Sequence, residues 1–140
     1  MLLKRWNRVG SQANIYTMMG AGYNLEDSRE TLNHFENRSF GFIGLQTDYE
    51  TPRIYTALSG FSLVGPSIRA YSGRYRLGVA PYIAKFKELQ IWMIGQIDYM
   101  SDMEEQPHVT PMLRFFYRTV LWETGVSISG VYWFQMMVHF

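Results

Sequence analysis

Few residues in this sequence could carry acid–base, nucleophilic or metal chemistry, and they are widely spaced. The histidines are His34, His108 and His139, and no two of them have the spacing of a metal-binding pair. Cysteine is absent, which excludes a thiolate metal site, a cysteine nucleophile and a disulfide scaffold. We therefore expect no metal site and no cofactor.

Serine-based catalysis is not indicated either. Ser127 and Ser129 have no base beside them in the sequence, so nothing predicts an activated hydroxyl. Glycine-rich stretches such as GAGYNLED lie within predicted strands, whereas a phosphate-binding loop lies between a strand and a helix. The sequence thus predicts no catalytic residues and a protein that is not an enzyme.

Charged and amide side chains offer a different kind of site. Several of them fall on one face of the predicted strands, and they are Arg74, Arg76, Gln90, Gln96, Asp98, Arg114 and Arg118. A register set by a turn at 86–88 places Arg76 nearly opposite Asp98. The group could form a path for ions or solutes, or an internal salt-bridge network. A barrel of seven or eight strands has room only for side chains, which favours the network.

The elements that position these residues are predicted to be β-strands throughout. Apolar and polar residues alternate with a period of two between Gly, Pro, Asn and Asp, while helical periodicity is hard to find. The predicted strands cover residues 12–24, 38–49, 53–64, 73–86, 88–100, 109–122 and 126–140. Residues 1–11 form an N-terminal segment or a partial strand, and a tight hairpin turn is expected at 123–125.

Length and composition limit the class of protein. A chain of 140 residues has room for one domain, here predicted to be a single β-barrel over residues 1–140. Charged residues make up 18% of the chain and the net charge is +1, so no nucleic-acid surface is expected. No run of 18 or more apolar residues predicts a transmembrane helix.

The two faces of the predicted strands differ in polarity. One face carries no charge inside a strand, and its members include Ala13, Ile43, Leu45, Tyr55, Ala57, Phe61, Leu77, Met93, Phe115 and Leu121. The other face carries the polar residues named above, with Asn14, Asp48 and Gln135. A soluble barrel would have to expose the apolar set or bury unpaired charges, which costs several kcal/mol. A membrane barrel instead places the apolar face against lipid.

The end of the chain carries a family resemblance. Residues Val131 to Phe140 read VYWFQMMVHF, with alternating aromatic and aliphatic positions that end on Phe. This ending resembles the C-terminal strand of Gram-negative outer-membrane β-barrel proteins. The resemblance implies an antiparallel up-and-down transmembrane β-barrel in the bacterial outer membrane, with Phe140 as the signal that the barrel-assembly machinery reads. Some small barrels of this class modify lipid A, but the His-x-Ser motif of the deacylase type is missing here.

An orientation follows from that resemblance. With Phe140 at the periplasm, two aromatic girdles are predicted, formed by Tyr23, Tyr75, Tyr99 and Phe140 at the periplasmic edge and by Tyr49 and Tyr55 at the outer edge. The longer segments 25–37, 65–72 and 101–108 then fall on the periplasmic side, which reverses the usual pattern of long external loops.

Closure raises the question of strand number. An open sheet edge in hydrocarbon leaves backbone N–H and C=O groups unsatisfied, and single-chain bacterial barrels have even numbers of strands. About seven or eight strands are predicted here, so the barrel would be completed by residues 1–11, by upstream strands of a longer parent, or by a partner chain.

The leading hypothesis is a non-enzymatic integral outer-membrane β-barrel, which is structural or serves as an anchoring or partner-docking subunit, with or without a narrow, porin-like pore. Its expected partners are the lipid bilayer and the barrel-assembly machinery. The alternatives are an outer-membrane lipid-modifying enzyme and a soluble lipocalin-like ligand-binding barrel.

Overall fold

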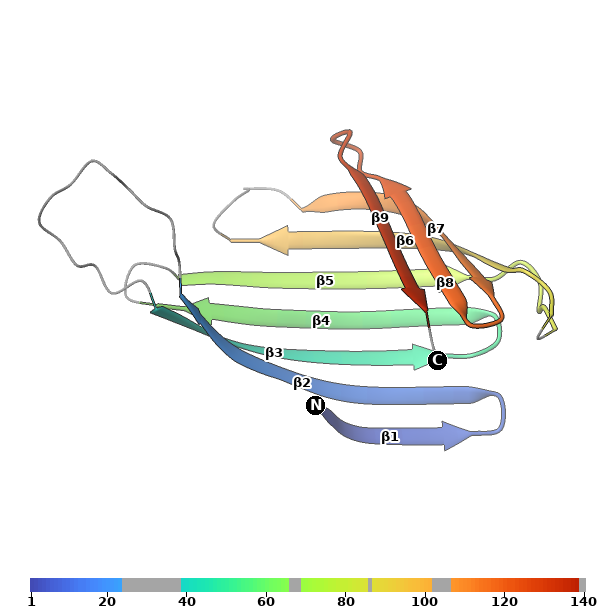
Figure 1. The fold of residues 1–140 in the computed structure, drawn as a ribbon, viewed down its shortest axis with the longest axis horizontal. Helices are drawn as coiled ribbons and strands as arrows, with labels where there is room; N and C mark the ends of the chain where they lie inside the picture. Colours follow the sequence, from blue (N-terminus) through green and yellow to red (C-terminus); the bar gives the residue numbers. More distant parts are fainter. Residues whose placement is uncertain (24–38, 66–68, 86, 102–106, 139–140) are drawn as a thin grey trace, which may run out of the picture.

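The residues that the structure describes form one antiparallel sheet of nine strands, which follow each other in sequence order (Figure 1). The computed structural model describes residues 1–23, 39–65, 69–85, 87–101 and 107–138. The strands are β1 (Leu2–Arg8), β2 (Ser11–Tyr23), β3 (Ser39–Glu50), β4 (Ile54–Val64), β5 (Arg69–Val79), β6 (Gln90–Met100), β7 (His108–Tyr117), β8 (Val120–Val126) and β9 (Tyr132–Val138). The predicted all-β, antiparallel, up-and-down architecture is confirmed.

The number of strands differs from the predicted seven or eight. The N-terminal segment forms a full strand, β1, which pairs with β2. The predicted strand 109–122 is divided into β7 and β8 by a turn at 118–119, and the predicted strand 126–140 begins only at Tyr132. The predicted strand 73–86 is displaced, since β5 begins at Arg69 and ends at Val79.

The turn at 118–119 was missed and a turn at 123–125 was wrongly predicted, because the residue types that usually mark a turn are absent from the first segment and present in the second. The turn at 118–119 contains Arg118 with a φ of 53°, a left-handed conformation that is uncommon for residues other than glycine. No Gly, Pro, Asn or Asp marks it in the sequence. The segment Glu123–Gly125, which has a glycine, lies inside β8 and pairs with Met112–Arg114, so the hairpin predicted there was wrong.

The sheet is strongly curved, and its two edges are β1 and β9 (Figure 1). Side chains of β9 such as Gln135 line the same cavity as side chains of β2 such as Asn14, so the sheet curls around one face. We call that the concave face and the opposite one the convex face. Among the described residues β1 and β9 do not pair, so the predicted closure into a barrel is not seen. No helix in the described part of the chain is long and apolar enough to cross a membrane.

The concave face is the buried one. Its apolar centre is a cluster of Ala80, Trp92, Ile94 and Met112, against which Tyr55 and Trp133 pack. Polar side chains are buried beside this cluster, and they include Asn14, Gln96 and Glu123. The inside of this sheet is therefore built from polar and apolar groups together.

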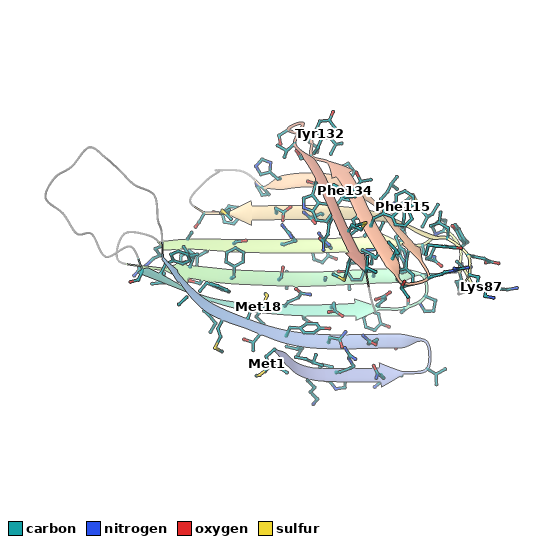
Figure 2. The ribbon with its side chains drawn as sticks, viewed as in Figure 1. Met1, Met18, Lys87, Phe115, Tyr132 and Phe134 are labelled. Carbon is teal, nitrogen blue, oxygen red and sulfur yellow. The ribbon has the colours of Figure 1, made fainter. Side chains whose placement is uncertain are left out.

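The convex face is apolar and exposed. Large exposed side chains cover it from one edge to the other, including Ile43, Leu45, Leu58, Leu77, Met93 and Phe134. Figure 2 shows side chains projecting from the sheet at Phe115 on β7 and at Phe134 on β9. Ile43 has 60% of its surface exposed and Met93 50%. The separation of an uncharged face from a polar face holds for most strands.

Strand β4 was assigned to the wrong parity. Ala57 is buried and lies between Asp48 of β3 and Arg76 of β5, both on the concave face. Tyr55, Ala57 and Phe61 therefore face the concave side, while Leu58 is exposed on the convex side. The turn at 118–119 has the same effect on Leu121, which lines a concave cavity.

The connections at the two ends of the sheet differ in length. Three connections at the end where β9 finishes are short turns, 9–10, 51–53 and 118–119, and the fourth is 80–89. The connections at the opposite end are 24–38, 65–68, 101–107 and 127–131. The predicted placement of the long segments at the end that carries the C-terminus was wrong, because the missed turn at 118–119 adds one reversal of the chain.

Candidate functional site: a polar network on the concave face

The centre of the site is a buried carboxylate held by two guanidinium groups. The Glu123 side chain is 2% exposed, and Arg114 Nε donates to its Oε1 at 2.5 Å. Arg76 Nη1 donates to its Oε2 at 3.2 Å. Both arginine side chains are 12% exposed. One negative and two positive charges are thus removed from water together, which is tolerable only because each is paired.

A chain of hydrogen bonds extends this centre along the sheet. Arg76 Nε donates to Gln96 Oε1 at 2.6 Å, and Gln96 Nε2 donates to Asp98 Oδ2 at 2.5 Å. Arg74 Nε in turn donates to Asp98 Oδ1 at 2.5 Å, at a more exposed position. In the described part of the chain, every buried side-chain nitrogen or oxygen atom has a hydrogen-bond partner. The buried polar atoms of the network therefore all have partners.

The structure brings together most of the predicted polar group, with three differences. Arg76 lies opposite Gln96, and Asp98 lies opposite Arg74, so the predicted pairing of Arg76 with Asp98 is displaced by two residues. The reason is that residues 80–89, and not 86–88, connect β5 to β6. Two members lie outside the network. Gln90 bonds to the backbone of Tyr82 and Ala84, and Arg118 lies in the turn over the ring of Tyr117.

Two aromatic rings cover the arginines. Arg114 lies 4.3 Å from the ring centroid of Tyr55, and Arg76 lies 5.4 Å from that of Trp133. These are cation–π distances, and such contacts are worth more where the cation is desolvated. Tyr55 therefore belongs to the concave network, so its predicted place in an outer aromatic girdle was wrong.

The other predicted girdle residues have mixed positions. Tyr49 and Tyr99 are exposed on the convex face near strand ends, at opposite ends of the sheet. Tyr75 is exposed too, but it lies in the middle of β5, opposite Leu58 and Ile97, because β5 begins four residues earlier than predicted. The side chain of Tyr23 and the whole of Phe140 lie outside the described residues.

Near the N-terminal edge, a second polar chain crosses three strands. Arg5 Nε of β1 donates to Asn14 Oδ1 at 2.8 Å, and Asn14 Nδ2 donates to Asp48 Oδ1 at 2.7 Å. Asn14 is 2% exposed, so this amide is as buried as Glu123. The arrangement continues the polar lining of the concave face across to its edge strand.

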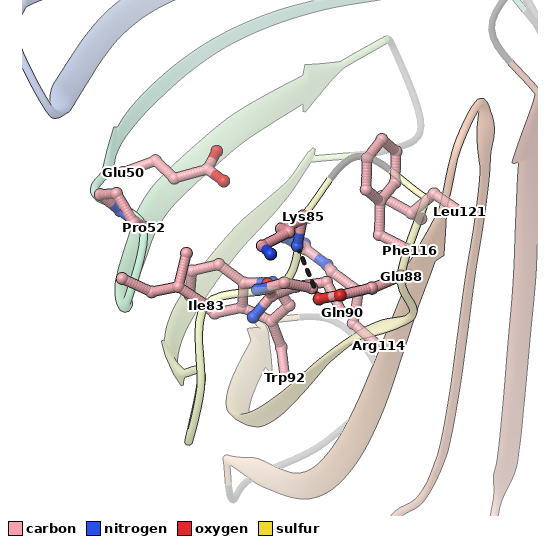
Figure 3. A pocket seen from close by; sticks show the side chains of 11 residues that line it. Glu50, Pro52, Ile83, Lys85, Glu88, Gln90, Trp92, Arg114, Phe116 and Leu121 are labelled. Carbon is pink, nitrogen blue, oxygen red and sulfur yellow. Dashed lines mark hydrogen bonds between the residues drawn. The ribbon is translucent and has the colours of Figure 1, made fainter.

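Cavities border the side chains of the central network. One of about 450 Å³ is lined by Glu50, Lys85, Glu88, Trp92 and Arg114 among others (Figure 3). Another, of about 410 Å³, is lined by Phe61, Gln96, His108, Ser127 and Trp133 among others. Arg114 borders the first cavity and Gln96 the second, and a third cavity of about 290 Å³ is lined by Arg76, Arg114 and Glu123 among others.

His108 and Ser127, which line the second cavity, both contact Ser129, and the sequence did not reveal these contacts. His108 Nδ1 lies 3.3 Å from Ser129 Oγ, and Ser129 Oγ lies 2.8 Å from Ser127 Oγ. No base lies beside these serines in the sequence, but the chain between β8 and β9 folds back to the start of β7 and brings His108 next to Ser129. Asp98 lies opposite His108 on the adjacent strand. In the described residues, no three metal-ligating side chains come together.

The most important residue missed from the sequence is Glu123. It was placed in a turn because of the Gly125 that follows it. A usable signal was present, since a hairpin centred on 118–119 pairs Arg114 with Glu123 and puts opposite charges side by side. Trp133 shares the strand parity of Gln135, but its contact with Arg76 depends on the curl of the sheet, which no local pattern encodes.

Comparisons with known protein families, with curated proteins and with solved structures gave no match for this chain.

Proposed function

We propose that this protein is an integral β-sheet protein of the bacterial outer membrane, with its convex face in contact with lipid and its concave face lining a polar interior. Its role is non-enzymatic: it serves as a structural, anchoring or partner-docking subunit. The single observation that carries the proposal is the inverted polarity of the sheet. Carboxylate, amide and guanidinium groups are buried, while aliphatic side chains are exposed.

This inversion is hard to reconcile with a water-soluble barrel. In a soluble sheet the apolar face is the one removed from water, since its burial provides the main driving force for folding. Here Ile43, Leu45 and Leu58 each have more than half of their surface exposed. Lipid acyl chains solvate such side chains without cost, so a bilayer accounts for both faces at once.

The lengths of the connections support the same proposal. Outer-membrane barrels have short periplasmic turns and longer external loops. At the end of the sheet where β9 finishes, three connections are turns of two or three residues and the fourth, 80–89, has ten residues, while the 15-residue connection 24–38 belongs to the other end. If the end where β9 finishes faces the periplasm, as the resemblance implies, the three short turns and the longest connection follow the pattern of outer-membrane barrels.

The concave network suits a filled interior better than a wide channel. Hydrogen bonds from Arg114 through Glu123 and Arg76 to Gln96 cross the concave face from β7 to β5 and β6. An open pore would require these ion pairs to break. Breaking an ion pair leaves a buried charge without its counter-charge, which is costly. We therefore expect little steady conductance across a planar bilayer.

The test is insertion into lipid. The chain, unfolded in urea, is diluted into phosphatidylcholine vesicles and floated on a density gradient, and its migration is compared on gels with and without boiling. We expect the protein to float with the vesicles and to show heat-modifiable migration. A folded, soluble monomer in buffer without lipid or detergent would overturn the proposal and favour the lipocalin-like alternative.

A second candidate function, lipid modification, is favoured by one contact. A serine hydroxyl beside a histidine nitrogen is the arrangement from which a nucleophile is generated, and contacts in unliganded sites are often longer than 3.2 Å. The cavity beside it has apolar walls from Phe61, Met100 and Trp133 that suit an acyl chain. An acyl-ester hydrolase or transferase would use Ser129 as the nucleophile.

A fluorophosphonate probe distinguishes the two functions. Labelling of the vesicle-inserted protein that is lost in both Ser129→Ala and His108→Ala, and kept in Ser127→Ala, would favour the enzyme. Absence of labelling in the inserted protein supports the non-enzymatic function.

A further inference from the structure

The two edges of the sheet run in the same direction. Each strand from β1 to β9 is antiparallel to the next, and nine is an odd number, so β1 and β9 point the same way. Both edge strands have seven residues, and β1 is exposed along its whole length. If the protein lies in a membrane, as proposed above, the backbone groups of these edges must find hydrogen-bond partners, because lipid supplies none.

The shared direction restricts what can pair with the edges. Direct contact between β1 and β9 would create one parallel pair in a sheet whose eight strand pairs are all antiparallel. A second copy inserted in the same orientation would meet the first through β9 and β1, again in parallel. Parallel pairs are slightly less stable, and purely antiparallel sheets are favoured over mixed ones. Antiparallel closure requires an odd number of added strands.

The charge of Lys4 on β1 indicates a property of any strand that pairs with this edge. Lys4 lies opposite Ile15 on the convex face, 4.8 Å from the ring centroid of Trp6. The other cations of that face, Arg8 and Arg69, stand at strand ends. Lys4 is thus the single charged side chain in a strand interior on the convex face of the described residues. A lysine that faces lipid is unfavourable, and a neighbouring carboxylate would compensate its charge.

We propose that a partner β-segment with an odd number of strands, antiparallel to both edges, pairs with β9 on one side and with β1 on the other. The strand beside β1 carries an acidic residue next to Lys4. The strand beside β9 has apolar side chains on the convex side, where Tyr132, Phe134 and Met136 are exposed, and polar ones on the concave side, where Gln135 lies. This inference rests on the proposed function.

The test adds strands to the full chain. Segments of one, two or three designed strands, each with alternating valine and threonine and joined by Asn-Gly turns, are fused ahead of Met1, and the unextended chain is the control. A Phe134→Cys substitution in β9 is combined with a second cysteine, placed at one position at a time along the outermost N-terminal strand. That strand is the first designed strand in the extended chains and β1 in the unextended chain. The native chain has no cysteine, so any disulfide formed in vesicles reports contact between these two strands.

We expect the one-strand or the three-strand chain to form an intramolecular disulfide with β9, and the unextended and two-strand chains to form none. A glutamate facing Lys4 in the first added strand should raise the crosslinked fraction several-fold over glutamine. Crosslinking of β9 to β1 in the unextended chain would show self-closure and overturn the proposal. Disulfide-linked dimers would show that a second copy of the chain pairs with the edge, and would also overturn the proposal. Crosslinking in the two-strand chain, or in none of the chains, would overturn it as well.

Flotation on the density gradient separates this inference from the proposed function. Chains that float with vesicles but fail to crosslink in an odd-numbered variant overturn the partner segment alone. Chains that do not float at all overturn the membrane function on which it rests.

Discussion

Arg76 and Glu123 form an ion pair at 3.2 Å although their strands, β5 and β8, are separated in the sheet by β6 and β7. On a flat sheet, strands three places apart lie about 14 Å from each other, so both side chains would have to lie fully extended across the two strands between them. The curl of the sheet brings the two side chains together, and their ion pair stabilises it. Arg114, next to Glu123 on β7, completes the bridge.

Removing the shared carboxylate should be costly. In Glu123→Gln, two buried guanidinium groups lose their counter-charge, and we expect a loss of about 3–5 kcal/mol in the free energy of unfolding. Urea titration of the refolded protein in detergent micelles measures it. The matched control is Asp98→Asn, whose partner Arg74 is 45% exposed and whose loss should cost about 0–1 kcal/mol. Equal losses would contradict a central role for Glu123.

The corrected parity of β4 can be tested with arginine. Leu58→Arg places a charge on the convex face and should cost about 2–4 kcal/mol in vesicles if that face meets lipid at mid-depth. Gln46→Arg, on the concave face of the adjacent strand near Asp48, should cost much less. Unfolding by urea in vesicles is the measurement. A larger loss for Gln46→Arg would mean that the concave side faces lipid.

Gly125 marks a close approach of two strands. A Cβ added there would lie 2.6 Å from Met112 Cγ and 2.7 Å from the Pro111 carbonyl oxygen, so β7 and β8 would have to move apart. We expect Gly125→Ala to lower the free energy of unfolding by about 1–3 kcal/mol. Gly73→Ala is the control, because nothing lies within 4 Å of its added Cβ. Comparable transitions for the two variants would rule out a tight contact at Gly125.

The C-terminal resemblance makes a separate prediction. Deletion of Phe140 should reduce assembly in the outer membrane of cells much more than it reduces refolding into detergent, because one interfacial aromatic contributes only about 1–3 kcal/mol of burial. Quantitative blotting of outer-membrane fractions, beside urea titration in micelles, gives the comparison. An equal loss in both assays would show that Phe140 acts through packing and is not an assembly signal.

The sequence predicted the all-β, antiparallel, up-and-down sheet, although not its open edges, because period-two alternation survives in nearly every strand. The pattern misled at β4, because neither the odd-numbered nor the even-numbered residues of this strand carry a charge. Only the pairing of Ala57 with Asp48 and Arg76 shows which side chains of β4 face the concave side. It misled again at 118–119, since the reversal there uses Arg118 in a left-handed conformation in place of glycine. One hidden turn was enough to misplace Glu123 and to invert the ends at which the long connections lie.

The site was predictable in its residue types but not in its connections. Alternation alone grouped Arg74, Arg76, Gln96, Asp98 and Arg114 on one face, and the structure joins all five into hydrogen-bonded chains on that face. The contacts between Arg76 and Glu123, and between His108 and Ser129, depend on curvature and on the path of the chain between β8 and β9. Neither property has a local signature.

The strictly sequential order of the strands has a kinetic consequence. Every strand pair joins neighbours along the chain, so each hairpin can form after closing only its own connection, and turns such as 9–10 and 118–119 lose little entropy in doing so. The pair between Arg76 and Glu123 spans 47 residues and needs four strands already in place. We therefore expect the hairpins to form first and the sheet to curl last, so that the ion pair between Arg76 and Glu123 forms late in folding.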